Sequence, residues 1–149
     1  MPWRIGAERI AKTEQRMKLS YLCLLIACLL PIVAAGVAKW GAFSQPPGQG
    51  GYDNRDPRAW LARQTGRRAR ANAAQANSFE ALPLFIAAVL GAQQLQVRQA
   101  LIDGLALTFV LLRLAYLYLY VTDRASARTL VWMAALVVNV ALFLSPWWA

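Results

Sequence analysis

Two charged side chains interrupt apolar stretches of the sequence, and they are the residues best placed to do chemistry. Glu80 is the only charged residue in the 27 positions that follow Arg70, and Arg113 is the only one in the 19 positions before Asp123. A charge inside a membrane span costs about 2.5–3.5 kcal/mol on insertion scales, so it marks either a functional site or a structural ion pair. Each lies roughly 15 Å along a helix from its charged boundary. We therefore expect Glu80 and Arg113 to pair, within one subunit or between subunits.

Further polar residues share a helical face with each of these charges. Steps of three or four residues place such positions on one side of a helix. The first face comprises Arg63, Arg67, Arg70, Ala74, Asn77, Glu80 and Leu84; the second comprises Arg113, Tyr116 and Tyr120, continued by Arg124 and Arg128. This density of polar groups at one depth favours a pocket for a small zwitterionic or polyanionic ligand. Pro83 removes a backbone donor and predicts a bend just beyond Glu80.

Four apolar stretches of membrane-spanning length must position these residues. About 20 apolar residues cross a bilayer core, and we expect spans near 19–40, 71–95, 100–122 and 128–147 within one membrane domain over 19–149. A basic segment, 1–18, precedes them, with Met17 as an alternative start. A cleaved signal peptide is the rival interpretation of the first stretch. The pattern predicts an all-α integral membrane four-helix bundle.

The segments between the spans predict how the chain is oriented. Residues 41–56 are rich in Pro and Gly and form a loop, after which Asp56 and Pro57 begin a basic surface helix that reaches Arg70. The first and third loops hold nine Lys and Arg residues, against six on the opposite side. The positive-inside rule therefore places the first and third loops in the cytoplasm.

The composition excludes several classes of function. The 149 residues are 58% hydrophobic, against about 45–50% in soluble domains. The net charge of +9 lies mainly between apolar stretches and accompanies no nucleic-acid recognition module. Because the sequence has no His, we expect no His-based catalysis and no metal site. Cys23 and Cys28 are too far apart on a helix for a disulfide and are expected to be small buried apolar residues.

Two short motifs carry a resemblance to a known family. Asn77, Glu80 and Pro83 form an Asn-x-x-Glu-x-x-Pro motif after Arg70, and the third span contains an Arg-x-x-Tyr-x-x-x-Tyr motif. Together with the length and the four spans, they resemble the MAPEG family, the membrane-associated proteins of eicosanoid and glutathione metabolism. The resemblance covers roughly residues 17–149 and is to members of the bacterial type.

The resemblance implies a homotrimer in the bacterial inner membrane, with glutathione as co-substrate bound between neighbouring subunits and a lipophilic electrophile arriving from the bilayer. Arginines would hold the glutathione carboxylates, Glu80 its amino group or an Arg, and Asn77 its peptide groups. Arg124 or Arg128 would stabilise the thiolate, since nearby cations lower a thiol pKa from about 8.5. The implied glutathione-binding residues are Arg70, Asn77, Glu80, Arg113, Tyr116 and Tyr120. A glutathione transferase or peroxidase is the expected activity.

Two other functions stay open. Ala73 and Ala81 stand where glutathione-binding relatives tend to carry Arg and Tyr, which favours a non-catalytic lipid-binding or scaffold protein of the same fold. A small multidrug-type transporter also has four short spans and a membrane Glu. Such carriers place that Glu in the first span and leave it unpaired, whereas Glu80 lies in the second span and is expected to face an Arg.

Overall fold

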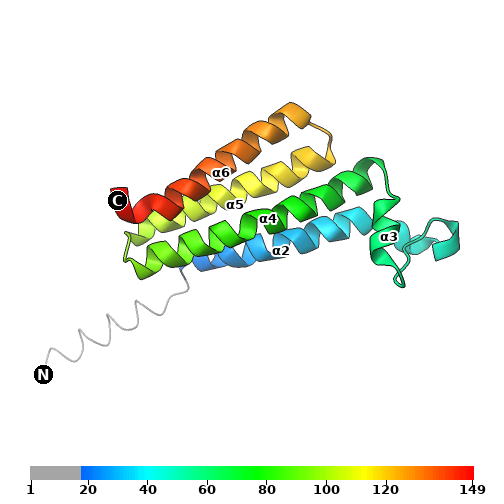
Figure 1. Cartoon of the computed structure of the whole chain (residues 1–149), viewed down its shortest axis with the longest axis horizontal. Coiled ribbons are helices and arrows are strands. Elements are labelled where there is room, and N and C mark those ends of the chain that lie inside the picture. The colour runs from blue at the N-terminus through cyan, green and yellow to red at the C-terminus, as the bar shows by residue number, and fades with distance from the viewer. Residues whose placement is uncertain (1–17) are drawn as a thin grey trace, which may run out of the picture.

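The structure of the protein is a computed structural model in which residues 18–149 are described, so nearly all of the basic segment 1–18 and the possible start at Met17 lie outside the described residues. The described part contains four long helices, α2 (Leu19–Lys39), α4 (Gly66–Gln94), α5 (Gln99–Val121) and α6 (Ala125–Trp148). They lie side by side along the long axis (Figure 1). The short helix α3 (Pro57–Ala62) and two 3-10 turns, η1 (Ala42–Ser44) and η2 (Pro47–Gln49), gather at one end.

Helices α4 and α5 form the middle of the bundle, because each contacts the other three long helices. Helix α2 packs mainly on α4, and α6 packs mainly on α5. Small side chains allow this close approach, as is usual between membrane helices. The fully or almost fully buried alanines of the four long helices are Ala27, Ala34 and Ala38 on α2, Ala71, Ala74, Ala88 and Ala92 on α4, Ala106 on α5 and Ala135 on α6.

Aromatic stacking joins the two central helices. Phe85 on α4 and Phe109 on α5 stack with ring centroids 4.1 Å apart, and both are buried. The stack lies one to two helical turns beyond Glu80 and Arg113 along their own helices. It therefore fixes the rotation of α4 against α5 close to Glu80 and Arg113.

The connection between α3 and α4 differs from the single basic helix expected up to Arg70. Helix α3 ends at Ala62, and α4 begins at Gly66 with a backbone φ of +59°, a left-handed conformation that glycine adopts without strain. Arg63 therefore does not share a helical face with Glu80, and that part of the predicted stripe is wrong. The remainder of the basic segment forms the first turns of α4, which then runs without interruption through Pro83.

Four polar residues join three helices at the end of the bundle far from α3. We call Ser20, Gln93, Gln99 and Asp103 the Ser20 cluster. Asp103 Oδ1 accepts a hydrogen bond from the Ser20 backbone N–H at 2.9 Å and one from Gln99 Nε2 at 2.7 Å. The Ser20 hydroxyl accepts from Gln93 at 2.9 Å and from Gln99 at 3.2 Å. The Asp103 carboxylate, which belongs to α5, lies at the N-terminus of α2, where the helix dipole favours a negative charge.

The outer surface is apolar along the helices. All four long helices are long and apolar enough to cross a membrane. Large side chains such as Ile32 and Val137 are more than half exposed, as lipid-facing residues would be. Trp40 and Trp147 are about four-fifths exposed near helix ends, where membrane proteins concentrate interfacial aromatics. Tyr118 is 67% exposed, whereas Tyr116, two residues earlier on α5, is buried.

Candidate functional site

Arg113 is the centre of a polar group inside the bundle. Only 3% of its surface is exposed. Its Nη1 donates to Asn77 Oδ1 at 3.0 Å, its Nη2 donates to Ser78 Oγ at 3.2 Å, and its guanidinium lies 4.4 Å from the ring centroid of Tyr116. The Ser78 hydroxyl donates to the carbonyl of Ala74, which leaves its lone pairs free to accept from Arg113. A buried cation is thus held by neutral partners on the neighbouring helix.

Glu80 reaches Arg113 through Asn77 and not directly. Asn77 Nδ2 donates to Glu80 Oε2 at 3.0 Å while its oxygen accepts from Arg113. A direct Glu80–Arg113 ion pair within one subunit is therefore wrong, because Arg70–Asp123 is the one ion pair within 4 Å among residues 18–149; a pair between subunits stays a prediction. The physical reason is that an amide carries both a donor and an acceptor, so Asn77 fits between the two charges. We call Asn77, Ser78, Glu80 and Arg113 the Arg113 cluster.

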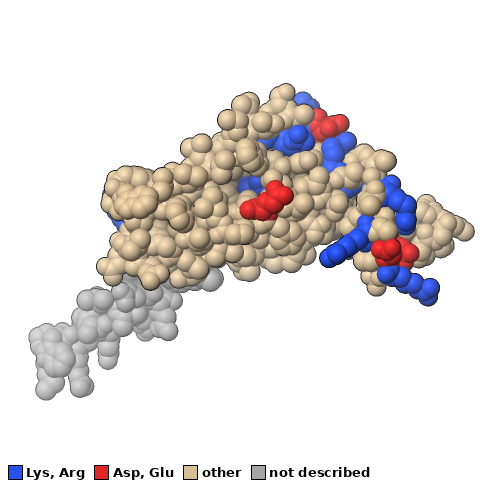
Figure 2. All heavy atoms as spheres, viewed as in Figure 1, with Lys and Arg blue, Asp and Glu red and all other residues tan. Residues whose placement is uncertain are grey.

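The carboxylate of Glu80 lies at the surface of the isolated subunit. Glu80 is the central residue of the 29-residue helix α4 and is exposed. Figure 2 shows one acidic group in the middle of the otherwise uncharged helical body, beside a hollow with basic atoms inside it. Other charges gather near α3 and near the turn between α5 and α6. The Arg113 cluster therefore opens laterally at mid-height of the bundle.

Two aromatic rings between two cations form a row that leads from Arg113 toward the α5–α6 turn. Tyr116 and Tyr120 meet edge to face, with ring centroids 5.4 Å apart. Arg128 of α6 lies 4.2 Å from the centroid of the Tyr120 ring. Such stacking is worth about 0.5–1 kcal/mol at exposed sites and more where water is excluded. Four of the sequence-predicted residues thus form one row that ends with Arg128.

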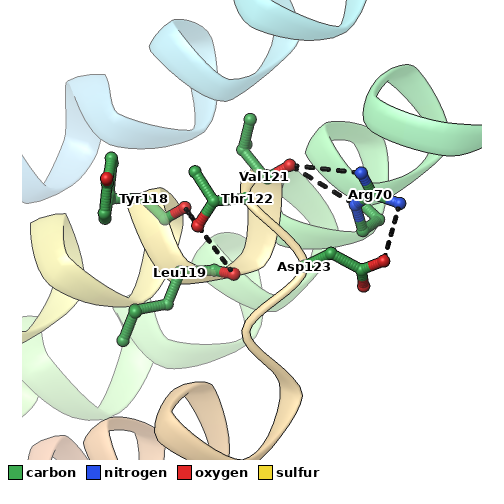
Figure 3. Close-up of polar contacts among 6 residues, drawn as sticks. All are labelled: Arg70, Tyr118, Leu119, Val121, Thr122 and Asp123. Atoms are coloured by element: carbon green, nitrogen blue, oxygen red, sulfur yellow. Dashed lines mark hydrogen bonds and ion pairs between the residues drawn. The ribbon is translucent and has the colours of Figure 1, made fainter.

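Arg70 and Arg124 lie apart from the Arg113 cluster. Arg70 pairs with Asp123 at 3.4 Å and donates twice to the carbonyl of Val121, at 3.4 Å each (Figure 3). Asp123 has a φ of +63° in the turn after α5, a conformation that Asp tolerates better than most residues. Arg70 therefore caps the C-terminus of α5, where the helix dipole favours a cation. Arg124 is exposed and is the N-cap residue directly before α6.

A cavity of about 130 Å³ adjoins the Arg113 cluster between α4, α5 and α6. Its polar lining consists of Asn77, Glu80, Arg113 and Asn139, and its apolar lining consists of Ala81, Leu84, Phe109, Trp132, Ala135 and Leu136. Sequence reasoning did not place Ser78 or Asn139 at the site. Asn139 had a signal, because it is the one strongly polar residue in the fourth span. Ser78 had only its position next to Asn77.

The described residues hold no group of three or more His, Cys, Asp or Glu side chains that could bind a metal ion. Cys23 and Cys28 are both free. Cys23 is buried, as expected, but Cys28 is exposed on the outer side of α2, so the expectation that it is buried is wrong. Five residues along a helix rotate the second Cys away from the face of the first.

Comparison with known proteins gives one match. The model of the MAPEG family matches residues 19–148, which is nearly the whole chain and contains all four long helices. No curated protein and no solved structure matches the chain significantly. The match and the four apolar helices together identify an integral membrane protein. The chain belongs to the MAPEG family.

Proposed function

We propose that this protein binds glutathione at the Arg113 cluster and uses it, as a transferase or a peroxidase, on lipophilic electrophiles from the bilayer. The observation that carries the proposal is the buried Arg113 joined through Asn77 to the exposed Glu80, next to a cavity. Glutathione carries one ammonium group and two carboxylates. A fixed cation, amide and carboxylate within hydrogen-bonding reach of one another match that pattern of charges.

Arg128 is the residue that we propose for thiolate formation. Extended over three residues, a tripeptide spans about 10 Å, so one anchored near Arg113 reaches along Tyr116 and Tyr120 toward Arg128. A cation near the thiol favours the thiolate, which is the nucleophile. The thiolate attacks the electrophilic carbon and displaces its leaving group. With a hydroperoxide, it attacks the terminal oxygen and the O–O bond breaks to release the alkoxide; the glutathione sulfenic acid that forms condenses with a second glutathione to the disulfide and water. Arg124 and Arg70, nearer the surface, would attract the anionic tripeptide.

The exposure of Glu80 supports a homotrimer. A carboxylate in the middle of a membrane helix is costly in contact with lipid, so it calls for a protein neighbour or a bound ligand. A neighbouring subunit packed over this opening supplies both the cover and a second wall for glutathione. We propose, from the Lys and Arg counts, that the α3 end and the α5–α6 turn face the cytoplasm, the side from which glutathione arrives.

The direct test uses the purified protein in detergent. Glutathione binding is followed by calorimetry, thiolate formation by ultraviolet difference absorbance, and turnover with a chloronitrobenzene electrophile. We expect binding at millimolar or lower concentration and conjugation above the uncatalysed rate. The highest glutathione concentration in the titration is about 10 mM, roughly tenfold above a dissociation constant of about 1 mM. An absence of binding at that concentration would refute the proposal.

A non-catalytic lipid-binding protein of the same fold is the second candidate. The observation that favours it is Ala81 in the cavity wall, where a glutathione-binding relative tends to carry Tyr, together with the largely apolar lining. Lipid that co-purifies at the subunit interface, without any thiolate signal, would favour this candidate.

A small multidrug-type transporter fits less well, since Glu80 already accepts a hydrogen bond from Asn77.

A further inference from the structure

Asn139 is a buried polar side chain that the glutathione proposal does not use. It belongs to α6, lines the cavity beside Glu80 and Arg113, and is only 2% exposed. Its Oδ1 is buried and has no hydrogen-bond partner among the described residues. An acceptor left unpaired in this way destabilises the folded protein, so a donor that enters the cavity would gain by pairing with it. The terminal torsion of Asn is broad, so the oxygen can turn toward a group that enters the cavity.

We propose that this cavity binds a neutral, ring-sized apolar group that carries a hydrogen-bond donor, such as a phenol or another hydroxylated lipophile, with Asn139 as its polar partner. The volume of about 130 Å³ is close to that of a cavity of about 150 Å³ known to admit benzene. The walls formed by Phe109, Trp132 and Leu136 are apolar. A ligand of this kind reaches the site from the bilayer.

The charges around the cavity decide between a neutral and an ionic ligand. Glu80 and Arg113 have opposite charges and are joined through Asn77, so the lining is already balanced. A lipophile that carried a charge of its own would add an uncompensated charge to this lining in a medium of low dielectric constant, which is expensive. Two of the five N–H groups of Arg113 donate to Asn77 and Ser78, and the others are the donors that the proposed function assigns to glutathione. The oxygens of Asn139 and Glu80 are then the available polar groups, and they accept hydrogen bonds.

The inference goes beyond the proposed function and does not require glutathione. If both hold, the cavity is where the polar end of the lipophilic co-substrate lies while the thiolate approaches from the row that ends at Arg128. The two ideas fail separately, because binding to the cavity can be measured with no glutathione present.

The test compares para-fluorophenol with para-fluoroanisole, its methyl ether, by fluorine NMR titration of the purified protein in detergent. The two probes share a ring, but only the phenol has a donor. We expect Asn139→Leu to weaken binding of the phenol about tenfold, the effect of one lost hydrogen bond to a buried group, and to leave binding of the ether unchanged.

The matched control is Ser145→Ala. Ser145 is also buried on α6 with an unpartnered oxygen, but it does not line the cavity. Its substitution is expected to change neither titration. Leu136→Phe, which narrows the cavity, is expected to weaken both probes and serves if Asn139→Leu fails to fold. Equal phenol binding by wild type and Asn139→Leu, or no saturable binding of the phenol by wild type, would overturn the proposal.

Discussion

The Ser20 cluster and the Arg113 cluster are both polar groups inside an apolar bundle, but they are completed differently. In the Ser20 cluster, each of four side chains hydrogen-bonds another member of the cluster, and Asp103 in addition accepts from the backbone at the start of α2. In the Arg113 cluster, Glu80 is exposed and the neighbouring Asn139 oxygen has no partner. A cavity lies beside the second cluster. Satisfied polar networks hold helices together, whereas an incomplete one has capacity left for a ligand or a neighbour.

The largest effect is expected from Arg113→Leu. It removes the cation that both Asn77 and Ser78 hold and leaves Glu80 without a nearby opposite charge. Loss of the guanidinium leaves the oxygens of Asn77 and Ser78 without their donor, which costs about 1–3 kcal/mol for each buried group. We expect loss of glutathione binding together with a fall of about 3 kcal/mol in the free energy of unfolding, measured by denaturing-detergent titration. Full stability in the variant would show that Arg113 does not join α4 and α5.

Asp103→Ala, in the Ser20 cluster, should lower the stability of the protein without changing its affinity for glutathione. The substitution leaves the Ser20 backbone N–H and the Gln99 amide without their acceptor, a loss of about 1–3 kcal/mol for buried donors. We expect unfolding at lower denaturant concentration but an unchanged glutathione affinity in the remaining folded protein. A tenfold change in affinity would mean that the Ser20 cluster also serves the ligand, and the contrast between the clusters would fail.

Arg128→Leu is expected to act on the thiol and not on the fold. The stacking of Arg128 on Tyr120 is replaced by an apolar contact, so the unfolding free energy should change little. Loss of a nearby cation should raise the pKa of bound glutathione's thiol by about one unit, or about 1.4 kcal/mol. The pH dependence of the thiolate absorbance measures this pKa. Arg124→Leu is the control, since the exposed Arg124 should have the smaller effect.

The smallest effect is expected from Arg70→Ala. Arg70 caps α5 through the Val121 carbonyl and the Asp123 carboxylate, and it is partly exposed. A cation at a helix C-terminus contributes about 0.3–1 kcal/mol. We therefore expect a stability loss in that range and less than a threefold change in glutathione affinity. A large loss of affinity with unchanged stability would restore Arg70 to the binding residues implied by the family resemblance.

The sequence predicted the helices of this protein better than its side-chain partners. The four spans could be located from the lengths of the apolar stretches. The neighbouring positions of Asn77 and Glu80 could be predicted because residues three apart lie on the same face of any α-helix. Arg63 departs from the predicted stripe because the φ of +59° at Gly66 breaks the helix, which periodicity alone does not reveal. Asn139 escaped notice as a site residue because its direction depends on how α6 is rotated against α4 and α5. The position of Asn77 between the two charges depends on side-chain rotamers.

Glu80→Gln, compared with wild type by glutathione calorimetry and by denaturing-detergent unfolding of the same preparation, tests the central claim most directly. Gln keeps the shape and the acceptor for Asn77 but removes the charge. If the Arg113 cluster is a binding site, glutathione affinity should fall at least about tenfold, or about 1.4 kcal/mol, while the proposed trimer and the unfolding free energy persist. Loss of the trimer with the affinity of the remaining folded protein unchanged would contradict that claim and make Glu80 a structural residue.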